Sequence, residues 1–405
     1  MTDTATELPA YPFDNPRDPF IPLAEAQRSG LVGPPSRVRL PTGGWAWLVT
    51  RHADIRHLLR QPGLSSDLTR PGFPLMRELP ADFDRNNARG SFIRMDGAEH
   101  AKFRRILTPE FMIKNIRRLE PLIQQTVDET LNAMRDAGPP ADLVQAFALP
   151  VPSMVICHLL GVPYQDHEFF QTRSNKLINL LTPVEEVRVA ADELSEYLDG
   201  LVTTKLAERP AEDLLSRLVH ERLATGELTR EEIVGVALLL LIAGHETTAN
   251  MIGLSTLVLL REPERFAALG ADPTGAAALV EELLRYLSIV RTGLLRVATE
   301  DTEIGGQPVR AGEGVIALLS LANRDEAVFA EPDGFSLDRS VNPHIAFGFG
   351  VHQCIGQPLA RAELRIALVE LARRFPTLRT DATPEELPKR DTSVVYGLAE
   401  LPVTW

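Results

Sequence analysis

Apolar positions follow a helical period through the middle of the chain and a strand period towards both ends. From about Ala101 to Ala268, apolar residues recur at spacings of three and four. Before this region, Ser36 to Leu40 and Trp45 to Thr50 alternate as a β-hairpin does. Beyond Glu300, short strand patterns return between glycine-containing turns. The pattern predicts a mainly α protein with a minor β part.

The clearest predicted helix begins at Thr229 and runs to about Leu260. Thr229 and Glu232 have the spacing of a capping box, which starts helices. At 1.5 Å per residue this helix is about 48 Å long, enough to cross a domain. Its stretch Ile233 to Ala243 is apolar on all sides and therefore predicts a buried helix. A second long helix is expected from about Pro358 to Arg374.

Composition narrows the class of protein. The 405 residues are 44% hydrophobic and 24% charged, with no linker-like segment or repeat, which predicts one domain over residues 1–405. The net charge of -13 disfavours nucleic acid and anionic lipid as partners. The longest apolar run, Ile233 to Gly244, is about half of the ~20 residues that span a bilayer. No basic segment followed by an apolar one marks a secretory signal, so a cytoplasmic protein is expected.

Only two cysteines occur, and they have different surroundings. Cys157 lies in an apolar helical segment and is expected to be an ordinary core residue. Cys354 lies in a glycine-rich loop, residues 347–356, directly before the last long helix. Glycines permit close approach to a flat ligand, and a helix start favours a thiolate. A buried free cysteine in a tight turn fits the same local pattern.

Competing motifs fail on spacing. Gly348 and Gly350 open a dinucleotide-binding pattern whose third glycine position is Gln353. His245-Glu246 begins a zinc-protease pattern whose second histidine position is Ala249. No Cys-x-x-Cys pair is present for zinc. The pattern left is a single thiolate ligand, and the cofactor that uses one is haem.

Four separated motifs resemble those of soluble bacterial cytochromes P450, of the type that hydroxylates macrolides, sterol-like compounds and drugs. Phe347, Gly350, Cys354 and Gly356 fit the haem-thiolate signature Phe-x-x-Gly-x-x-x-Cys-x-Gly. The segment Ala-Gly-His-Glu-Thr-Thr at 243–248 resembles the family's oxygen-activating helix, and residues 282–285 fit its Glu-x-x-Arg. Residues 96–105 resemble the helix that meets the haem propionates. The resemblance implies the P450 fold, a triangular prism with a long helix crossing the haem.

The resemblance also assigns roles around the iron. Cys354 would be the axial ligand of haem b, and thiolate donation favours cleavage of the O–O bond. Glu246 and Thr247 would deliver protons. Ala243 and Gly244 would border a dioxygen groove, with a local opening of the helix at the glycine.

Other residues would hold the haem in place. His100, Arg104, Arg296 and His352 match the family's propionate contacts, and Phe347, Gly350 and Gly356 would shape the cysteine loop. Glu282 and Arg285 would form a buried structural pair behind the haem rather than a surface pair.

The chain contains no flavin or nicotinamide motif. By resemblance, electrons from NAD(P)H would arrive through a ferredoxin reductase and a ferredoxin. An acidic ferredoxin would dock on a basic patch near Cys354, although a solvated helix face would look similar. The residues proposed for this patch are Lys102, Arg104, Arg105, Lys114, Arg117, Arg118, Arg361 and Arg365.

The expected substrate is a bulky hydrophobic small molecule. The resemblance lines the pocket with mostly apolar segments: Pro71 to Phe92, Leu177 to Val187, Ile289 to Leu295, Val394 to Tyr396 and the central helix. The residues named as substrate contacts are Leu240, Val290, Arg291, Thr292 and Val394. Arg291 would anchor a carboxylate or hydroxyl, or else point away from the pocket or meet a protein carboxylate.

The predicted activity is insertion of one oxygen atom of O2 into a C–H bond. Two alternatives use the same fold: a peroxygenase or dehydratase that needs no electron partner, and a haem-binding sensor without turnover. The intact Glu246-Thr247 pair favours the monooxygenase over the peroxygenase.

Overall fold

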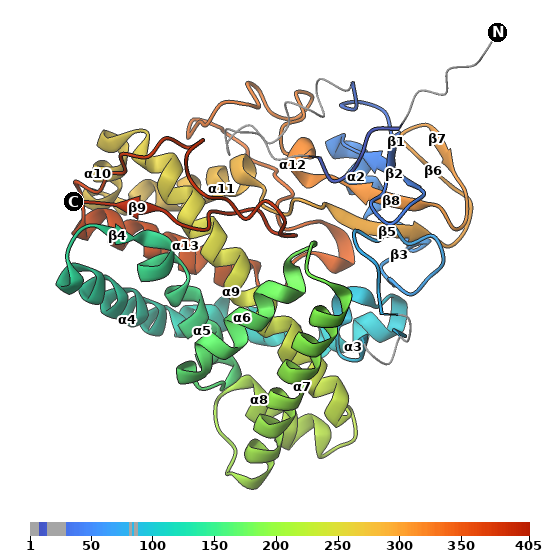
Figure 1. Ribbon diagram of the computed structural model, residues 1–405, viewed down its shortest axis with the longest axis horizontal. Helices are drawn as coiled ribbons and strands as arrows, with labels where there is room; N and C mark the ends of the chain where they lie inside the picture. Colours follow the sequence, from blue (N-terminus) through green and yellow to red (C-terminus); the bar gives the residue numbers. More distant parts are fainter. Residues whose placement is uncertain (1–7, 14–29, 81–82, 85–87) are drawn as a thin grey trace.

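The computed structural model describes residues 8–13, 30–80, 83–84 and 88–405. The larger sheet lies towards one end of the molecule, and the long helices fill the other (Figure 1). This mainly helical architecture with small sheets confirms the predicted fold class. Parts of the expected substrate loop, 81–82 and 85–87, and most of the N-terminal segment lie outside the described residues.

A five-stranded sheet has the order β1-β2-β8-β5-β3. Its strands are β1 (Ser36–Arg39), β2 (Trp45–Val49), β3 (Leu64–Ser65), β5 (Leu294–Ala298) and β8 (Gly314–Ala317). The first two form the predicted antiparallel hairpin, with Ser36 opposite Leu48. Parallel pairing of β2 with β8 joins this hairpin to the C-terminal third of the chain.

Two smaller sheets have two strands each. β4 (Ala141–Asp142) pairs with β9 (Pro402–Val403), and β6 (Thr302–Ile304) pairs with β7 (Gln307–Val309). The second pair turns at residues 305–306, where the sequence predicted a break between strands.

The helices are α2 (His52–Leu58), α3 (Gly97–Leu107), α4 (Ile113–Ala137), α5 (Pro150–Leu160), α6 (His167–Ile178), α7 (Val184–Ala207), α8 (Leu214–Arg217), α9 (Arg230–Leu260), α10 (Pro263–Ala271), α11 (Ala276–Leu287), α12 (Leu319–Ala322) and α13 (Gln357–Arg374). Short 3-10 or π turns are η2 (Phe92–Arg94), η3 (Thr108–Phe111), η4 (Val144–Ala148), η5 (Tyr164–Asp166), η6 (Leu218–Leu223), η7 (Pro273–Gly275) and η8 (Gly350–His352). Helix α13 begins within one residue of the predicted position.

The predicted central helix is α9. Thr229 is its N-cap, and the capping box with Glu232 is complete in both directions. The helix packs against α5, α7 and α13, which surround it in the helical part of the molecule. Within the described residues, α9 is the helix long and apolar enough to cross a membrane, and 56% of its most apolar window is buried inside the fold. That burial is typical of the core helix of a globular domain.

Packing in this core accounts for the properties of Cys157 and Gly244. Cys157 is 1% exposed, and burial raises the pKa of its thiol to about 12, as expected of an inert core cysteine. At Gly244, an added Cβ would lie 2.7 Å from the side chain of Ile156. The glycine therefore lets α5 pack closely against α9. The helix is continuous through this position, so the predicted local opening was wrong.

Candidate active site

The Cys354 loop is shaped by glycines before it reaches α13. The Cys354 N–H donates to the Phe347 carbonyl at 2.9 Å, which closes the loop. Gly348 and Gly350 have φ angles of 72° and 75°, a region that disfavours other residues. At Gly350, a Cβ would also lie 2.4 Å from the Leu59 carbonyl oxygen. Backbone conformation and packing thus account for glycine at positions 348 and 350.

The Cys354 sulfur lies at the N-terminal end of α13. A Cβ on Gly356 would lie 4.0 Å from Sγ. Cys354 is an exposed residue, yet desolvation by the protein around its sulfur raises the pKa of the thiol, and the N–H groups of Gly356 and Gln357 together with Arg104 oppose this only in part. These groups favour the thiolate, as predicted, but desolvation has the larger effect on the pKa. A bound metal ion would deprotonate such a thiol.

The structure brings together four of the residues assigned to the propionates. The His100 and His352 rings lie 4.0 Å apart. Burial, followed by the charges of His352, Arg104 and Arg296, lowers the pKa of His100 to about 4. Burial lowers the pKa of Arg296 itself to about 10. Three elements, α3, β5 and η8, contribute to this cluster.

This cluster suits an anionic ligand beside Cys354. The buried His100 Nε2 has no hydrogen-bond partner in the described structure. Arg104 Nη1 donates to the Gln353 carbonyl at 2.9 Å, which ties α3 to the residue preceding Cys354. An unsatisfied donor, two guanidinium groups and a sulfur ligand together fit the propionates and iron of a haem.

In α9, Ala243 and Thr247 lie on one face, and Ala243 is exposed. Thr247 Oγ1 donates to the Ala243 carbonyl at 2.8 Å. Glu246 is instead 1% exposed, and Arg390 Nη1 donates to its Oε2 at 2.7 Å. Burial raises the pKa of Glu246, but the contacts with His245 and Arg390 outweigh it and lower the pKa. The carboxylate is therefore held by the C-terminal segment rather than on the exposed face.

Glu282 and Arg285 form the expected buried pair on α11. Their exposed fractions are 1% and 0%, and the guanidinium binds both carboxylate oxygens, at 2.7 and 2.8 Å. Arg285 also donates to the carbonyls of Asn323, Pro332 and Gly334. Because both side chains are buried, they do not form the surface ion pair that was the alternative. The pair instead holds the segment that leads towards the Cys354 loop.

Three of the segments assigned to the substrate pocket lie side by side. The Arg291 N–H donates to the Val394 carbonyl at 3.1 Å, and Val290 bridges to Val395. The Val394 N–H donates in turn to the Ile178 carbonyl at the end of α6. Leu240 and Thr292, the remaining named contacts, are 6% and 3% exposed.

The Arg291 side chain bonds to other parts of the chain. Its guanidinium donates to the carbonyls of Asp391 and Phe13, the latter at 2.8 Å. Tyr11 donates to the Arg291 carbonyl at 3.3 Å. The side chain thus fastens the N-terminal segment to the C-terminal segment, and a role of Arg291 in holding the substrate stays a prediction.

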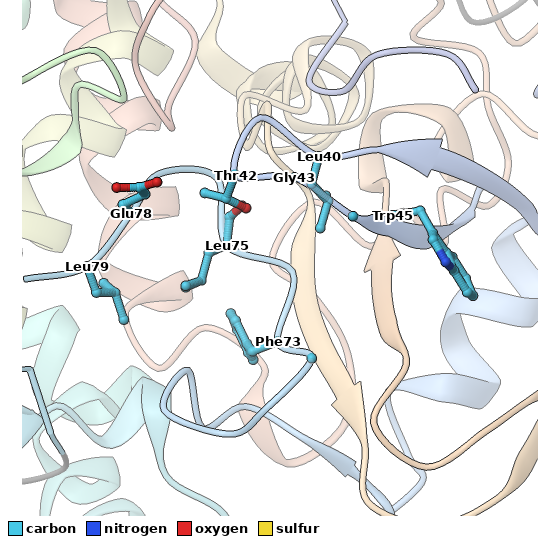
Figure 2. Close-up of a pocket in the computed structure, with 10 residues that line it drawn as sticks. Leu40, Thr42, Gly43, Trp45, Phe73, Leu75, Glu78 and Leu79 are labelled. Atoms are coloured by element: carbon cyan, nitrogen blue, oxygen red, sulfur yellow. The ribbon is translucent and has the colours of Figure 1, made fainter. Parts of the chain in front are cut away.

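A cavity of about 550 Å³ opens beside the β1–β2 hairpin (Figure 2). Phe73, Leu75, Glu78 and Leu79 come from the expected substrate loop, and Leu40, Thr42 and Trp45 come from the hairpin. Thr42 donates to the Leu75 carbonyl at 2.9 Å, which joins the two walls.

Two residues that bond to side chains of α9 were not singled out from the sequence. Arg390 contacts Glu246 across 144 residues, and no local pattern marks it. Glu363, on α13, is 1% exposed, bonds to Thr248, and has a pKa raised well above its ordinary value by burial. Its position four residues after Leu359 and four before Ala367, on one helix face, was an available signal for burial.

Comparison with known proteins agrees with this geometry. Residues 76–272 and 276–401 match the family described as cytochrome P450. The chain is 49% identical over 414 residues to pentalenic acid synthase of Streptomyces avermitilis, and 47% identical over 417 residues to vitamin D3 dihydroxylase of Streptomyces griseolus. Both alignments cover 100% of each chain.

Solved structures show the same fold. The mycinamicin VIII C21 methyl hydroxylase of Micromonospora griseorubida has a TM-score of 0.91 and 40% identity, covering 98% of this chain and 100% of that one. MoxA of Nonomuraea recticatena, a CYP105 protein, has a TM-score of 0.87 and 45% identity, covering 98% of each chain. The chain therefore belongs to the cytochrome P450 family and is a monooxygenase of the bacterial CYP105 group.

Proposed function

We propose that this monooxygenase hydroxylates a bulky, mainly hydrophobic small molecule in the cytoplasm, using O2 and electrons that a ferredoxin and its reductase supply from NAD(P)H. The observation that carries the proposal is the pairing of the Cys354 loop with the donor cluster of His100, Arg104, Arg296 and His352. This arrangement offers one sulfur ligand and several groups for carboxylates on neighbouring elements.

The cofactor is proposed to be haem b. Cys354 would ligate the iron, and the His100 cluster would hold the propionates. When bound, the haem supplies the binding and reductive cleavage of dioxygen. Phe347, Gly350 and Gly356 would shape the loop that carries the ligand. The Phe347 carbonyl accepts the Cys354 N–H, and a side chain at Gly350 would clash with the Leu59 carbonyl.

Thr247 and Glu246 are proposed to supply the protons that the reaction consumes. The Thr247 hydroxyl lies on the same face of α9 as the exposed Ala243. Glu246 would have to release Arg390 and rotate towards Thr247 to pass a proton. A carboxylate held by a breakable ion pair can keep water out of the site between turnovers.

The proposed substrate class rests on the chemistry of the lining. Leu240, Val290, Thr292 and Val394 offer mostly apolar contacts. Relatives are named for products or substrates such as pentalenic acid, vitamin D3 and mycinamicin VIII. A terpenoid, secosteroid or macrolide-like molecule is of this kind.

An absorption spectrum is the first test. Reduced protein exposed to carbon monoxide should show a Soret band far to the red, as thiolate ligation gives. A band typical of imidazole or thiol ligation would refute Cys354 as thiolate ligand. Turnover is then compared with reductant, ferredoxin and reductase, and with hydrogen peroxide alone. Product formed only with peroxide would favour the peroxygenase.

Replacement of the hydroxyl tests the proton route. Thr247→Ala should retain haem and substrate binding but divert electrons into hydrogen peroxide. Thr256→Ala, which removes a hydroxyl bonded to the Ile252 carbonyl in the same helix at 2.9 Å, is the matched control. Equal coupling of product to NAD(P)H in Thr247→Ala and the wild type would contradict the role.

A further inference from the structure

His245 and Glu246 are sequence neighbours whose side chains face each other inside the protein. His245 Nε2 lies 3.5 Å from Glu246 Oε1, and both side chains are at most 2% exposed. Within the described residues, neither of these two atoms has a hydrogen-bond partner. The acidic member of the predicted proton pathway therefore has a second titratable group beside it.

The other imidazole nitrogen fixes the protonation of the ring. His245 Nδ1 lies 2.6 Å from the Leu241 carbonyl oxygen, which only accepts hydrogen bonds. Nδ1 must therefore carry a proton. A neutral imidazole then presents the lone pair of Nε2 to Glu246 Oε1, leaving two unsatisfied buried acceptors. Burying such groups without partners is costly, and one proton between them removes that cost.

Of the two Glu246 carboxylate oxygens, Oε1 is the one that can take a proton. Arg390 occupies Oε2 and also donates to Asn175 Oδ1 at 2.9 Å. The Phe170 ring contacts His245 edge-on, with centroids 5.6 Å apart. Ser174, one turn after Phe170 on the same face of α6, has a buried hydroxyl without a partner. The α6 face that contacts His245 therefore carries a second polar group without a partner.

We propose that His245 is the proton-holding partner of Glu246, so that the two side chains share one proton between Nε2 and Oε1. During turnover Glu246 carries that proton towards Thr247, and a proton from water restores the pair. One proton leaves and one enters, and no electron moves within the pair. The proposal rests on the proposed role of Glu246, and His245 acts through that residue as a positioning residue.

Spectroscopy of the resting pair tests the shared proton without turnover. The protein is labelled with 15N-histidine, reduced and bound to carbon monoxide, which makes it diamagnetic. We expect either a protonated Nε2 signal absent in His245→Phe, or an infrared band of a protonated carboxyl absent in Glu246→Gln. An unprotonated Nε2 together with an ionised Glu246 would overturn the proposal. That outcome leaves the monooxygenase activity untouched, so the two failures are distinguishable.

Kinetics of three variants separate proton holding from packing. His245→Phe keeps a ring beside Phe170, and His245→Gln keeps a hydrogen-bond donor that cannot release a proton. In both, product formed per NAD(P)H should fall by about tenfold, with a larger solvent isotope effect and an unchanged KM. His52→Phe, a buried ring packed edge-on against Phe329 at 6.0 Å, controls for loss of a core imidazole.

Each result decides between the two roles. Full coupling in His245→Gln would show that a hydrogen bond alone suffices and would overturn proton holding. Full coupling in His245→Phe would overturn any role of the ring nitrogens. If His245→Phe loses its carbon-monoxide spectrum, His245→Gln and the spectroscopic test still decide the question.

Discussion

At the scale of single residues, burial sets the protonation state of Glu363. Its side chain is 1% exposed between α13 and α9, and burial raises its pKa well above the ordinary value. The folded protein therefore keeps this carboxyl neutral, whereas the unfolded chain ionises it above a pH of about 4.3. Since the unfolded state binds fewer protons there, Glu363 lowers stability as pH rises through this window.

Glu363→Gln should remove that pH dependence while keeping a hydrogen bond to Thr248. The urea midpoint of the variant should rise relative to the wild type as pH increases from about 5 to 8, measured by circular dichroism. Near pH 4 the two midpoints should converge. A difference between the midpoints that stays constant with pH would mean that Glu363 is ionised in the folded protein.

The buried position of Arg285 depends on the planar geometry of its guanidinium group. Its guanidinium binds Glu282 through two nitrogens and also donates to three backbone carbonyls. A lysine has three donors and no planar fork, so Arg285→Lys leaves buried acceptors unpaired. Breaking a buried pair costs about 3–5 kcal/mol.

We expect Arg285→Lys to lower haem content and the thermal midpoint of unfolding, measured by the Soret absorbance and circular dichroism. Arg265→Lys alters an exposed i,i+3 pair with Glu262, at 3.1 Å, and should change stability by less than about 1 kcal/mol. Equal effects of the two substitutions would contradict a structural role for the buried pair.

At the scale of elements, α9 carries glycines with different functions. A Cβ on Gly235 would lie 1.7 Å from the Arg89 carbonyl oxygen, because the turn at residues 88–90 crosses the helix there. A Cβ on Gly90 would lie 2.2 Å from the Glu232 carbonyl oxygen. The backbone of α9 and that of the 88–90 turn can therefore approach each other only because both positions are glycine. At Gly253, in contrast, the nearest atom would be 3.8 Å away, on Val144.

Gly235→Ala should displace the turn at 88–90, which ends the proposed substrate loop, and so weaken substrate binding several-fold. Gly253→Ala should leave binding unchanged and stabilise the helix by up to about 1 kcal/mol. Titration of the haem spin state with a substrate measures both. Unchanged binding in Gly235→Ala would mean that this crossing does not position the loop.

Local signals predicted the elements better than the contacts between them. The capping box at Thr229 and the hairpin at residues 36–49 depend on neighbours in sequence, and both were predicted from spacing. The contacts of Arg390 with Glu246 and of Arg291 with Phe13 cross 144 and 278 residues. Such contacts depend on how the chain folds back on itself, which periodicity does not encode. For the same reason, the sequence left the partner of Arg291 open.

At the scale of the whole molecule, the net charge of -13 makes the distribution of cations near Cys354 important for an acidic partner. Several residues of the predicted basic patch are already paired with carboxylates. The pairs are Lys102–Glu232 at 2.7 Å, Arg105–Glu227 at 3.0 Å, Arg361–Glu281 at 2.6 Å and Arg365–Glu120 at 3.0 Å. Their fields are therefore largely cancelled at a distance.

The start of α4 keeps its positive charge. Lys114, Arg117 and Arg118 are exposed and have no ion pair within the described structure. Met112 and Ile113 beside them are 56% and 63% exposed, so the surface combines charge with apolar area. The Arg365–Glu120 pair joins this end of α4 to α13, which begins three residues after Cys354. A ferredoxin docked here would lie on the cysteine side of the haem.

The double substitution Arg117→Glu and Arg118→Glu should therefore raise the KM for ferredoxin by about tenfold at low salt and flatten its dependence on ionic strength. Arg105→Glu changes the net charge by half as much and lies on α3 beside Glu227 rather than at the start of α4, so it should have a smaller effect and serves as the control for position. Stopped-flow reduction across a salt series measures both. If Arg105→Glu impairs reduction as strongly as the double substitution, docking extends along α3, and the paired cations contribute as much as the unpaired ones.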